Sequence, residues 1–160
     1  MSLTFTDIKK TSIKNINLLE NEGFKNNVNF SKIKKTFISK VEGFSVKQRF
    51  YIGHIYANVV SDQADIISFI IKDKYRRQGF GSILFVKFIA TLKSKGVKEI
   101  FLEVSEKNIV AQKLYNKLGF RNIGCRKNYY KTNSGKQNAY LLKLQAVSYT
   151  HLTLPTKRIV

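Results

Sequence analysis

The segment best suited to chemistry is RRQGFGS at residues 76–82, where two arginines precede two glycines at alternate positions. Glycine lets the backbone approach a ligand closely, and free N–H groups at the start of a following helix attract an anion such as a pyrophosphate. The segment lacks the GK[ST] ending of a P-loop and the third glycine of a dinucleotide fingerprint. Taken alone, it is compatible with a phosphate site or with an ordinary tight turn.

Hydrophobic periodicity predicts the elements that would position this segment. Residues 50–60 and 66–71 have strand-like patterns separated by a turn, which predicts two neighbouring antiparallel strands. The segment after the glycines predicts a helix that ends at Gly96. Its apolar face recurs at i, i+3, i+4 and i+7, in Phe85, Phe88, Ile89 and Leu92.

Four further elements are predicted toward the C-terminus. Residues 99–104 predict a short strand, and Asn108 is a candidate N-cap for a helix that ends at Gly119. The apolar face of that helix consists of Ala111, Leu114, Tyr115 and Leu118. Residues 120–131 and 138–144 then predict two strands joined by a hairpin turn.

The two ends of the chain carry weaker patterns. Helices are predicted over residues 13–19 and 30–38, and no further motif lies within residues 1–48. From residue 146 the chain continues no periodic pattern, so we expect residues 146–160 to form a tail outside the fold, non-native or disordered. The prediction is one domain over residues 1–145, of mixed α/β (α+β) architecture.

Composition sets the class of protein. The chain has 160 residues, 43% of them hydrophobic, and a formal net charge of +19. That charge favours contact with RNA, ribosomes or a polyphosphate cofactor, although lysine-rich usage also accompanies AT-rich genomes. No apolar stretch approaches the roughly 20 residues of a membrane helix. We therefore expect a cytoplasmic protein without membrane contact.

Cysteine and histidine contribute no evident chemistry. The single Cys125 cannot form an internal disulfide, and no Cys/His cluster suggests a metal site. Cys125 is expected to be a small buried hydrophobe, and His54 to be a strand residue rather than a catalyst.

Several motifs in order resemble the GNAT family of acyl-CoA-dependent N-acetyltransferases. They are the R-x-x-G-x-G turn, the strand FLEV at 101–104, the helix N-x-x-A-x-x-L-Y at 108–115 and the LGF ending at 118–120. The resemblance covers about residues 53–145. It implies the GNAT fold, with a central mixed, mostly antiparallel sheet flanked by helices, and acetyl-CoA as cosubstrate without a metal.

Within that family, the branch of bacterial ribosomal-protein alanine N-acetyltransferases is most similar. Glu103, Tyr115 and the segment RKNYY at 126–130 carry this closer resemblance. It implies that the acceptor is the α-amine at the N-terminus of a ribosomal protein. Residues 26–31, NNVNFS, depart from the Pro-Trp-Ser stretch of that branch, in a region that helps to form the acceptor groove. Three alternatives therefore stay open: a small amine, an aminoacyl-tRNA, or a non-catalytic acyl-CoA-binding or ribosome-associated module.

The resemblance implies a role for each site residue. Glu103 would be the general base and Tyr115 the general acid that protonates the leaving thiolate, whereas the pattern alone is also compatible with an edge carboxylate and a core tyrosine. Asn108 would contact the pantetheine arm, cap its helix, or do both. Tyr129 and Tyr130 would line the acceptor site or pack within their strand. Backbone groups that bind acetyl-CoA would come from Phe69, Ile70, Ile71, Arg76, Arg77, Gln78, Gly79, Phe80, Gly81 and Ser82.

The proposed chemistry requires groups of these two kinds. An α-ammonium has a pKa near 8 and must lose a proton before its nitrogen can attack a thioester. A carboxylate at the end of a strand can take that proton, directly or through water, and a phenol can supply one to the departing thiolate. Retention of both Glu103 and Tyr115 favours an enzyme over a binding module.

Overall fold

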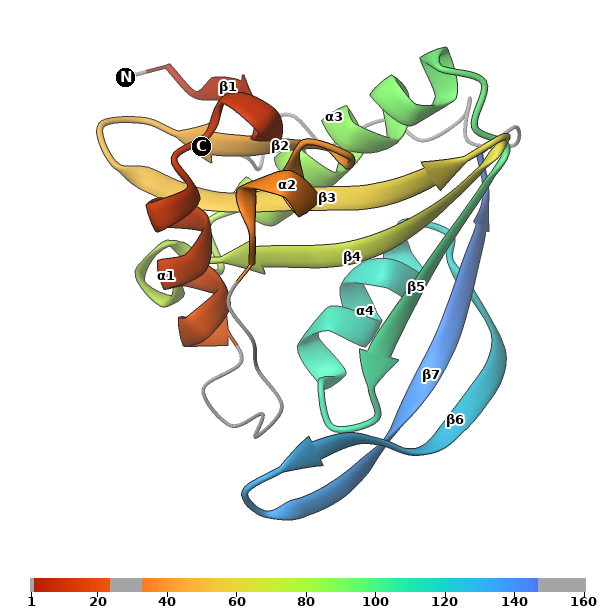
Figure 1. Cartoon of the computed structure of the whole chain (residues 1–160). Helices are drawn as coiled ribbons and strands as arrows, with labels where there is room; N and C mark the ends of the chain where they lie inside the picture. Colours follow the sequence, from red (N-terminus) through yellow and green to blue (C-terminus); the bar gives the residue numbers. More distant parts are fainter. Residues whose placement is uncertain (1, 24–32, 147–160) are drawn as a thin grey trace.

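The structure is a computed structural model that describes residues 2–23 and 33–146. A seven-stranded sheet runs through it in the order β1-β2-β3-β4-β5-β7-β6 (Figure 1). Neighbouring strands are antiparallel except β4 and β5, which are parallel. This mixed, mostly antiparallel sheet with flanking helices confirms the predicted fold class. The strands are β1 Thr4–Asp7, β2 Glu42–Lys47, β3 Tyr51–Val60, β4 Gln63–Ile71, β5 Glu99–Ser105, β6 Arg121–Thr132 and β7 Gly135–Gln145.

Helices cover both faces of the sheet. On one face, α1 and α2 enclose a small apolar cluster that includes Ile16, Ile38 and Tyr56. On the other face, α3 and α4 enclose the larger core, to which β3 contributes Ile55. Successive strand residues point to opposite faces, so β3 serves both cores. The helices are α1 Ile13–Gly23, α2 Lys35–Ile38, α3 Phe80–Ser94 and α4 Ile109–Lys117, with short 3-10 turns η1 Ile8–Lys10 and η2 Asp73–Tyr75.

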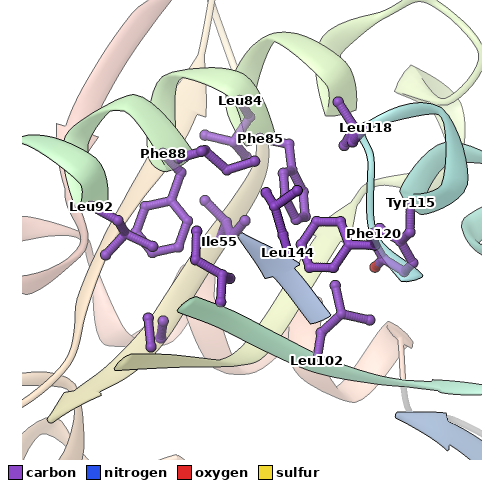
Figure 2. Close-up of a cluster of buried hydrophobic side chains, with 14 of the residues drawn as sticks. Ile55, Leu84, Phe85, Phe88, Leu92, Leu102, Tyr115, Leu118, Phe120 and Leu144 are labelled. Carbon is purple, nitrogen blue, oxygen red and sulfur yellow. The ribbon is translucent and has the colours of Figure 1, made fainter. Parts of the chain in front are cut away.

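The larger core explains why α3 forms where periodicity predicts it. All four residues of its predicted apolar face are fully buried. Phe85 is at the centre of this core, with its ring edge-on to Phe69 of β4 at a centroid distance of 5.0 Å and to Phe120 at 5.8 Å. Figure 2 shows Phe85, Tyr115 and Phe120 meeting beside Leu144. Gly96, at φ +87°, ends the helix as predicted.

The later elements also follow the sequence prediction closely. β3 and β4 form the expected antiparallel pair, and β6 and β7 form the expected hairpin. The side chain of Asn108 caps α4 by accepting the N–H of Ala111 at 3.1 Å, and Gly119 takes a left-handed φ of +97° after the helix. These elements are predictable because each carries its own local signal.

The N-terminal third corrects the prediction. Two strands, β1 and β2, were not predicted, and they extend the sheet beyond β3. The helix predicted over residues 30–38 is helical only over the four residues of α2, while residues 24–32 lie outside the described residues. β1 has four residues and β2 contains Gly43, so neither has a strong pattern of its own. Their strand conformation depends on pairing with β3 and with each other.

Two single residues also differ from expectation. Cys125 is exposed rather than buried, because it lies on β6, the last strand of the sheet, whose outer face is largely uncovered. Ala146 was assigned to the tail, yet it is fully buried in the larger core and donates its N–H to Lys98 O at 2.8 Å. The fold therefore extends one residue further than predicted, and residues 147–160 lie outside the described residues.

Candidate active site

The two central strands diverge at their carboxyl ends. β4 and β5 pair in parallel from Gln63 with Glu99 to Asp65 with Phe101, and the described ladder between them ends there. Figure 1 shows the strands separating from that point, β4 remaining beside β3 while β5 turns away beside β7. Backbone groups of β4 beyond Asp65 are therefore paired with β3 on one side and with no described strand on the other. Such an edge can bind an extended ligand through main-chain hydrogen bonds.

β4 also carries an irregularity at this edge. Tyr56 of β3 pairs with Ser68, but the next residue, Ala57, pairs with Ile66. Ile67 is therefore an extra residue in β4, a β-bulge, and its side chain is 42% exposed. Bulges bend the strand and re-aim its groups, and they occur often beside active sites. The bulge is followed by Ser68 and then by the three residues predicted to bind the cofactor through their backbone, Phe69, Ile70 and Ile71.

The turn between β4 and α3 has the geometry of an anion site. Arg77 and Gly79 both take left-handed φ values, +62° and +86°. The first bond of α3 runs from Ile83 N–H to Gly79 O at 3.1 Å, so the N–H groups of Phe80, Gly81 and Ser82 have no backbone acceptor within the described chain. Free N–H groups and the dipole of a 15-residue helix both favour an anion here.

The two arginines of this turn have different environments. Arg76 donates from Nε to Ile71 O at 2.8 Å and forms an ion pair with Asp73 at 2.7 Å, so its side chain braces the turn. Arg77 is exposed and has no ion pair among the described residues. Gln78 donates to Lys74 O at 3.1 Å and also stabilises the turn. The free positive charge beside the α3 N-terminus therefore belongs to Arg77.

Glu103 lies on β5, facing the hairpin of β6 and β7. Its side chain is 22% exposed and forms an ion pair with Arg126 Nε at 2.9 Å. Interaction with the Glu103 carboxylate is the main cause that raises the pKa of Tyr129. Glu103 lies beyond Phe101, where the β4–β5 ladder ends, so β5 is paired at this residue with β7 and with no described strand on its other side. Arg126 of β6 holds its carboxylate.

Tyr115 projects from α4 into the larger core. Its ring is 7% exposed and lies 6.4 Å from the Phe69 ring of β4, measured between centroids. Burial is the main cause that raises the pKa of the Tyr115 hydroxyl, and the nearby Tyr130 adds to the shift. Burial likewise raises the pKa of Tyr130, with the charge of Glu103 contributing. Both phenols therefore stay protonated at neutral pH.

These contacts bring four predicted residues into one group. Glu103 contributes to the raised pKa values of Tyr129 and Tyr130, and Tyr130 contributes to the raised pKa of Tyr115. The rings of Tyr129 and Tyr130 meet edge to face, with 5.1 Å between their centroids. Asn108 is exposed at the start of α4, and its cap is confirmed while its contact with a ligand remains a prediction. Glu103 and Tyr115 thus belong to one group of interacting side chains, and the turn before α3 follows the part of β4 that has no described partner on the β5 side.

Sequence reasoning missed one polar group on the other face of the sheet. Glu20 of α1 is 2% exposed, and its Oε1 atom is contacted by three side chains. The partners are His54 Nε2 at 2.8 Å, Tyr56 Oη at 2.8 Å and Ser68 Oγ. One signal was available, because Glu20 follows Ile16 by four residues and so interrupts the apolar face of α1. His54 is a strand residue, as expected, but it belongs to a buried network.

Neither a metal site nor a membrane-spanning helix is present among the described residues. No group of three or more His, Cys, Asp or Glu side chains in that part of the chain could hold a metal ion. No described helix is long and apolar enough to cross a membrane.

Comparisons with known proteins agree with this geometry. Ribosomal protein bS18-alanine N-acetyltransferase of Haemophilus influenzae is 41% identical over 92 residues, 57% of this chain and 62% of that enzyme. The enzyme of the same name from Haemophilus ducreyi is 30% identical over 128 residues, 79% of each chain. The crystal structure of the ribosomal-protein-S18-alanine N-acetyltransferase from Escherichia coli is 27% identical with a TM-score of 0.79, covering 96% of this chain and 100% of that one.

The chain spans less than two thirds of the length of the Haemophilus influenzae relative that it matches. The model of the acetyltransferase (GNAT) family matches residues 35–120, more than half of the chain. That segment contains β2 to β5, the turn between β4 and α3, and both Glu103 and Tyr115. The chain belongs to the GNAT family of acetyltransferases.

Proposed function

We propose that this protein transfers an acetyl group from acetyl-CoA to the N-terminal α-amine of a protein, and that the acceptor is a ribosomal protein. The observation that carries the proposal is the grouping of Glu103, Tyr115, Tyr129 and Tyr130, together with the turn that follows the part of β4 without a described partner on the β5 side. Acetyl-CoA is the acyl donor that the family uses.

The cofactor would lie along β4. Its pyrophosphate would bind the N–H groups of residues 77–82, with Arg77 adding charge. Its pantetheine arm would follow the backbone of Phe69, Ile70 and Ile71 and reach Asn108 at the start of α4. A backbone N–H group of β4 would then polarise the thioester carbonyl, as an oxyanion hole requires.

Glu103 would remove the proton from the acceptor α-ammonium, directly or through water. Its carboxylate is half-buried and within the group that faces the hairpin, where a peptide N-terminus could approach. In the free protein Arg126 occupies this carboxylate at 2.9 Å. An incoming ammonium would compete with the guanidinium for the same oxygen atoms, because both are cations.

Tyr115 would donate its proton to the departing CoA thiolate. Its hydroxyl stays protonated because burial raises its pKa, and its ring packs against Phe69 in the strand that would hold the thioester. Each of the two proton transfers would contribute roughly 10²–10⁴-fold to the rate.

Tyr129 and Tyr130 would line the acceptor site. Tyr129 is 47% exposed, and its hydroxyl interacts with the Glu103 carboxylate. A substrate that reaches the proposed base would therefore touch this ring. The names of the relatives, which specify the alanine of ribosomal protein bS18, favour a protein N-terminus over a small amine or an aminoacyl-tRNA.

The decisive experiment offers the purified protein three acceptors with acetyl-CoA. One is a peptide that carries the N-terminal sequence of ribosomal protein bS18 from the same organism, another is a small polyamine, and the third is an aminoacyl-tRNA. Mass spectrometry should find one acetyl group on the peptide α-amine and none on a matched peptide whose α-amine is blocked. Acetylation of the polyamine or the aminoacyl-tRNA alone would contradict the proposed acceptor, and no transfer to any of them would contradict the proposed activity.

A further inference from the structure

The buried network around Glu20 joins one helix to two strands. Glu20 comes from α1, His54 and Tyr56 from β3, and Ser68 from β4. His54 also meets the Tyr51 hydroxyl through Nδ1 at 2.6 Å, so the network extends to the start of β3. Burial and the charge of Glu20 raise the pKa of both Tyr51 and Tyr56, which keeps their hydroxyl groups protonated.

Apolar contacts alone can attach a helix such as α1 to a sheet, so the attachment itself does not explain the polar network. The surrounding cluster is apolar, with Ile8, Ile16 and Ile38 among its buried members. A buried carboxylate is costly unless hydrogen bonds satisfy it, and hydrophobic residues of similar volume often stabilise a protein equally well. Hydrogen bonds differ from apolar contacts in fixing direction and position. The network therefore suits a role in placing the groups that it touches.

Ser68 is the member whose backbone lies on the part of β4 beyond Asp65, where β4 has no described partner on the β5 side. It follows the bulged residue Ile67 and precedes Phe69, the first of the residues proposed to bind the cofactor. A bulge weakens the local ladder, because one residue has no partner on the neighbouring strand. The backbone at residues 67–69 therefore needs another constraint if its N–H groups are to stay aimed at a thioester.

We propose that Glu20 and Ser68 are positioning residues for acetyl transfer: the Glu20 carboxylate, by accepting the Ser68 hydroxyl, fixes the backbone of β4 at its bulge. This inference rests on the proposed function for its catalytic consequence. Neither side chain is assigned a contact with substrate or cofactor. They act from the α1 face of the sheet through the strand itself.

The chain offers a matched control for the test. Ser45 is also a buried serine, at 5% exposure like Ser68, and it lies on β2 opposite His54. Its hydroxyl is hydrogen-bonded to the hydroxyl of the partly buried Thr11 at 2.8 Å and has no described bond to β4. Ser68→Ala and Ser45→Ala therefore each remove a buried hydrogen bond from the same sheet, and only the first releases the bulge.

Two measurements decide between positioning and general stability. In steady-state kinetics, Ser68→Ala should lower kcat by about tenfold or more with little change in the KM for acetyl-CoA, since small misplacements near the reacting atoms are costly. Amide hydrogen exchange in the free protein should be faster at residues 67–69. Ser45→Ala should change neither quantity, although both variants lose thermal stability. Glu20→Gln should change both measurements in the same direction as Ser68→Ala but by less, because a neutral amide oxygen accepts the Ser68 hydroxyl more weakly than a carboxylate does.

Equal kcat, or equal exchange at residues 67–69, in the two serine variants would overturn the proposal. The exchange measurement needs no acetyl transfer, so it tests the positioning of β4 even where the wild-type protein acetylates nothing. Absence of wild-type transfer would count against the proposed function, and unchanged exchange in Ser68→Ala against the positioning role.

Discussion

Arg126 reaches across an intervening strand to pair with Glu103. Arg126 lies on β6 and Glu103 on β5, with β7 between them, and the two charged groups meet at 2.9 Å. The pairing register places Ala139 opposite Arg126 and Leu141 opposite Glu103, so all four residues share one face. The small side chain of Ala139 leaves room for the arginine to cross. The proposed base is thus covered by a side chain that is itself 57% exposed.

The first prediction concerns that cover. Arg126→Gln removes the cation that competes with the substrate ammonium, so the KM for the acceptor peptide should fall a few-fold and acetyl-CoA affinity should not change. The effect should shrink as salt rises from about 0.05 to 0.5 M, because exposed charges are screened. Arg121→Gln, also an exposed arginine on β6, is the control. An equal KM change in both variants would indicate general surface charge rather than competition at Glu103.

The second prediction separates the proposed base from the proposed acid. Glu103→Gln should lower turnover at neutral pH by roughly 10²–10⁴-fold, with partial recovery as rising pH deprotonates the α-amine near its pKa of about 8. Tyr115→Phe keeps the ring packed against Phe85 and Phe120 but removes the proton, so turnover should fall without alkaline recovery. The measurement is the pH profile of acetyl transfer, with folding of each variant checked. Near-wild-type rates in both variants would remove both assignments.

The third prediction tests the anion-binding turn. Gly79→Asp should abolish acetyl-CoA binding, because it places a carboxylate where the pyrophosphate is proposed to bind. The left-handed φ of +86° strains any side chain at this position, so Gly79→Asn is the control with the same shape and no charge. Calorimetry with acetyl-CoA on both folded variants is the measurement. Equal affinities for the two would show that charge at this turn does not matter.

The fourth prediction concerns the core beneath the site. Phe85→Ala should reduce the free energy of unfolding by about 3–5 kcal/mol, because the fully buried ring fills the space between Phe69, Tyr115 and Phe120. Phe50→Ala, at a ring that is 56% exposed, should cost much less. Urea unfolding of both variants gives the comparison, and similar losses would contradict the described packing.

The fifth prediction uses the acidity of Glu42. Hydrogen bonding with Lys95 is the main cause that lowers the pKa of Glu42, and Lys9 adds to it. A lowered folded-state pKa gives a stabilisation that is present above the unfolded pKa and is lost as pH falls through the folded one. Glu42→Gln should therefore be less stable than wild type at pH about 7, by at most about 1 kcal/mol for a partly exposed pair. Urea unfolding at pH about 3 should find the two equal, and a constant difference would contradict the ion pairing.

Local signals account for most of what was predictable from the sequence. Each of these signals depends on residues that are close together in the chain. They are the caps at Asn108 and Gly119, the apolar face of α3, and the turn that joins β6 to β7. β1 was missed because its pairing partner β2 lies far along the chain, with Thr4 opposite Lys47. β2 directly precedes its partner β3 and was missed because its own six residues carry no strong strand pattern. The burial of Ala146 was missed for the same reason, since one alanine carries no pattern.

The site was predictable in a different way. Glu103 and Tyr115 were identified by family resemblance, while no sequence rule places Arg126 on the Glu103 carboxylate across β7. The Glu20 network unites residues separated by 34 to 48 positions in the chain. Ser68 in an apolar strand, and His54 two residues before Tyr56, do not indicate a polar network by themselves. Only the fold brings these side chains to the Glu20 carboxylate.

The short ladder between β4 and β5 divides the sheet into two panels. One panel consists of β1 to β4 and the other of β5, β7 and β6, and the described contact between their strands is three residue pairs at one end (Figure 1). The two panels are also joined by the larger core, to which the first contributes Ile55 and Ala64 and the second Leu102 and Leu144. A molecule that contacts both panels would add a further link between them across the diverging ends of β4 and β5. Its binding should therefore slow proteolytic cleavage in both panels together.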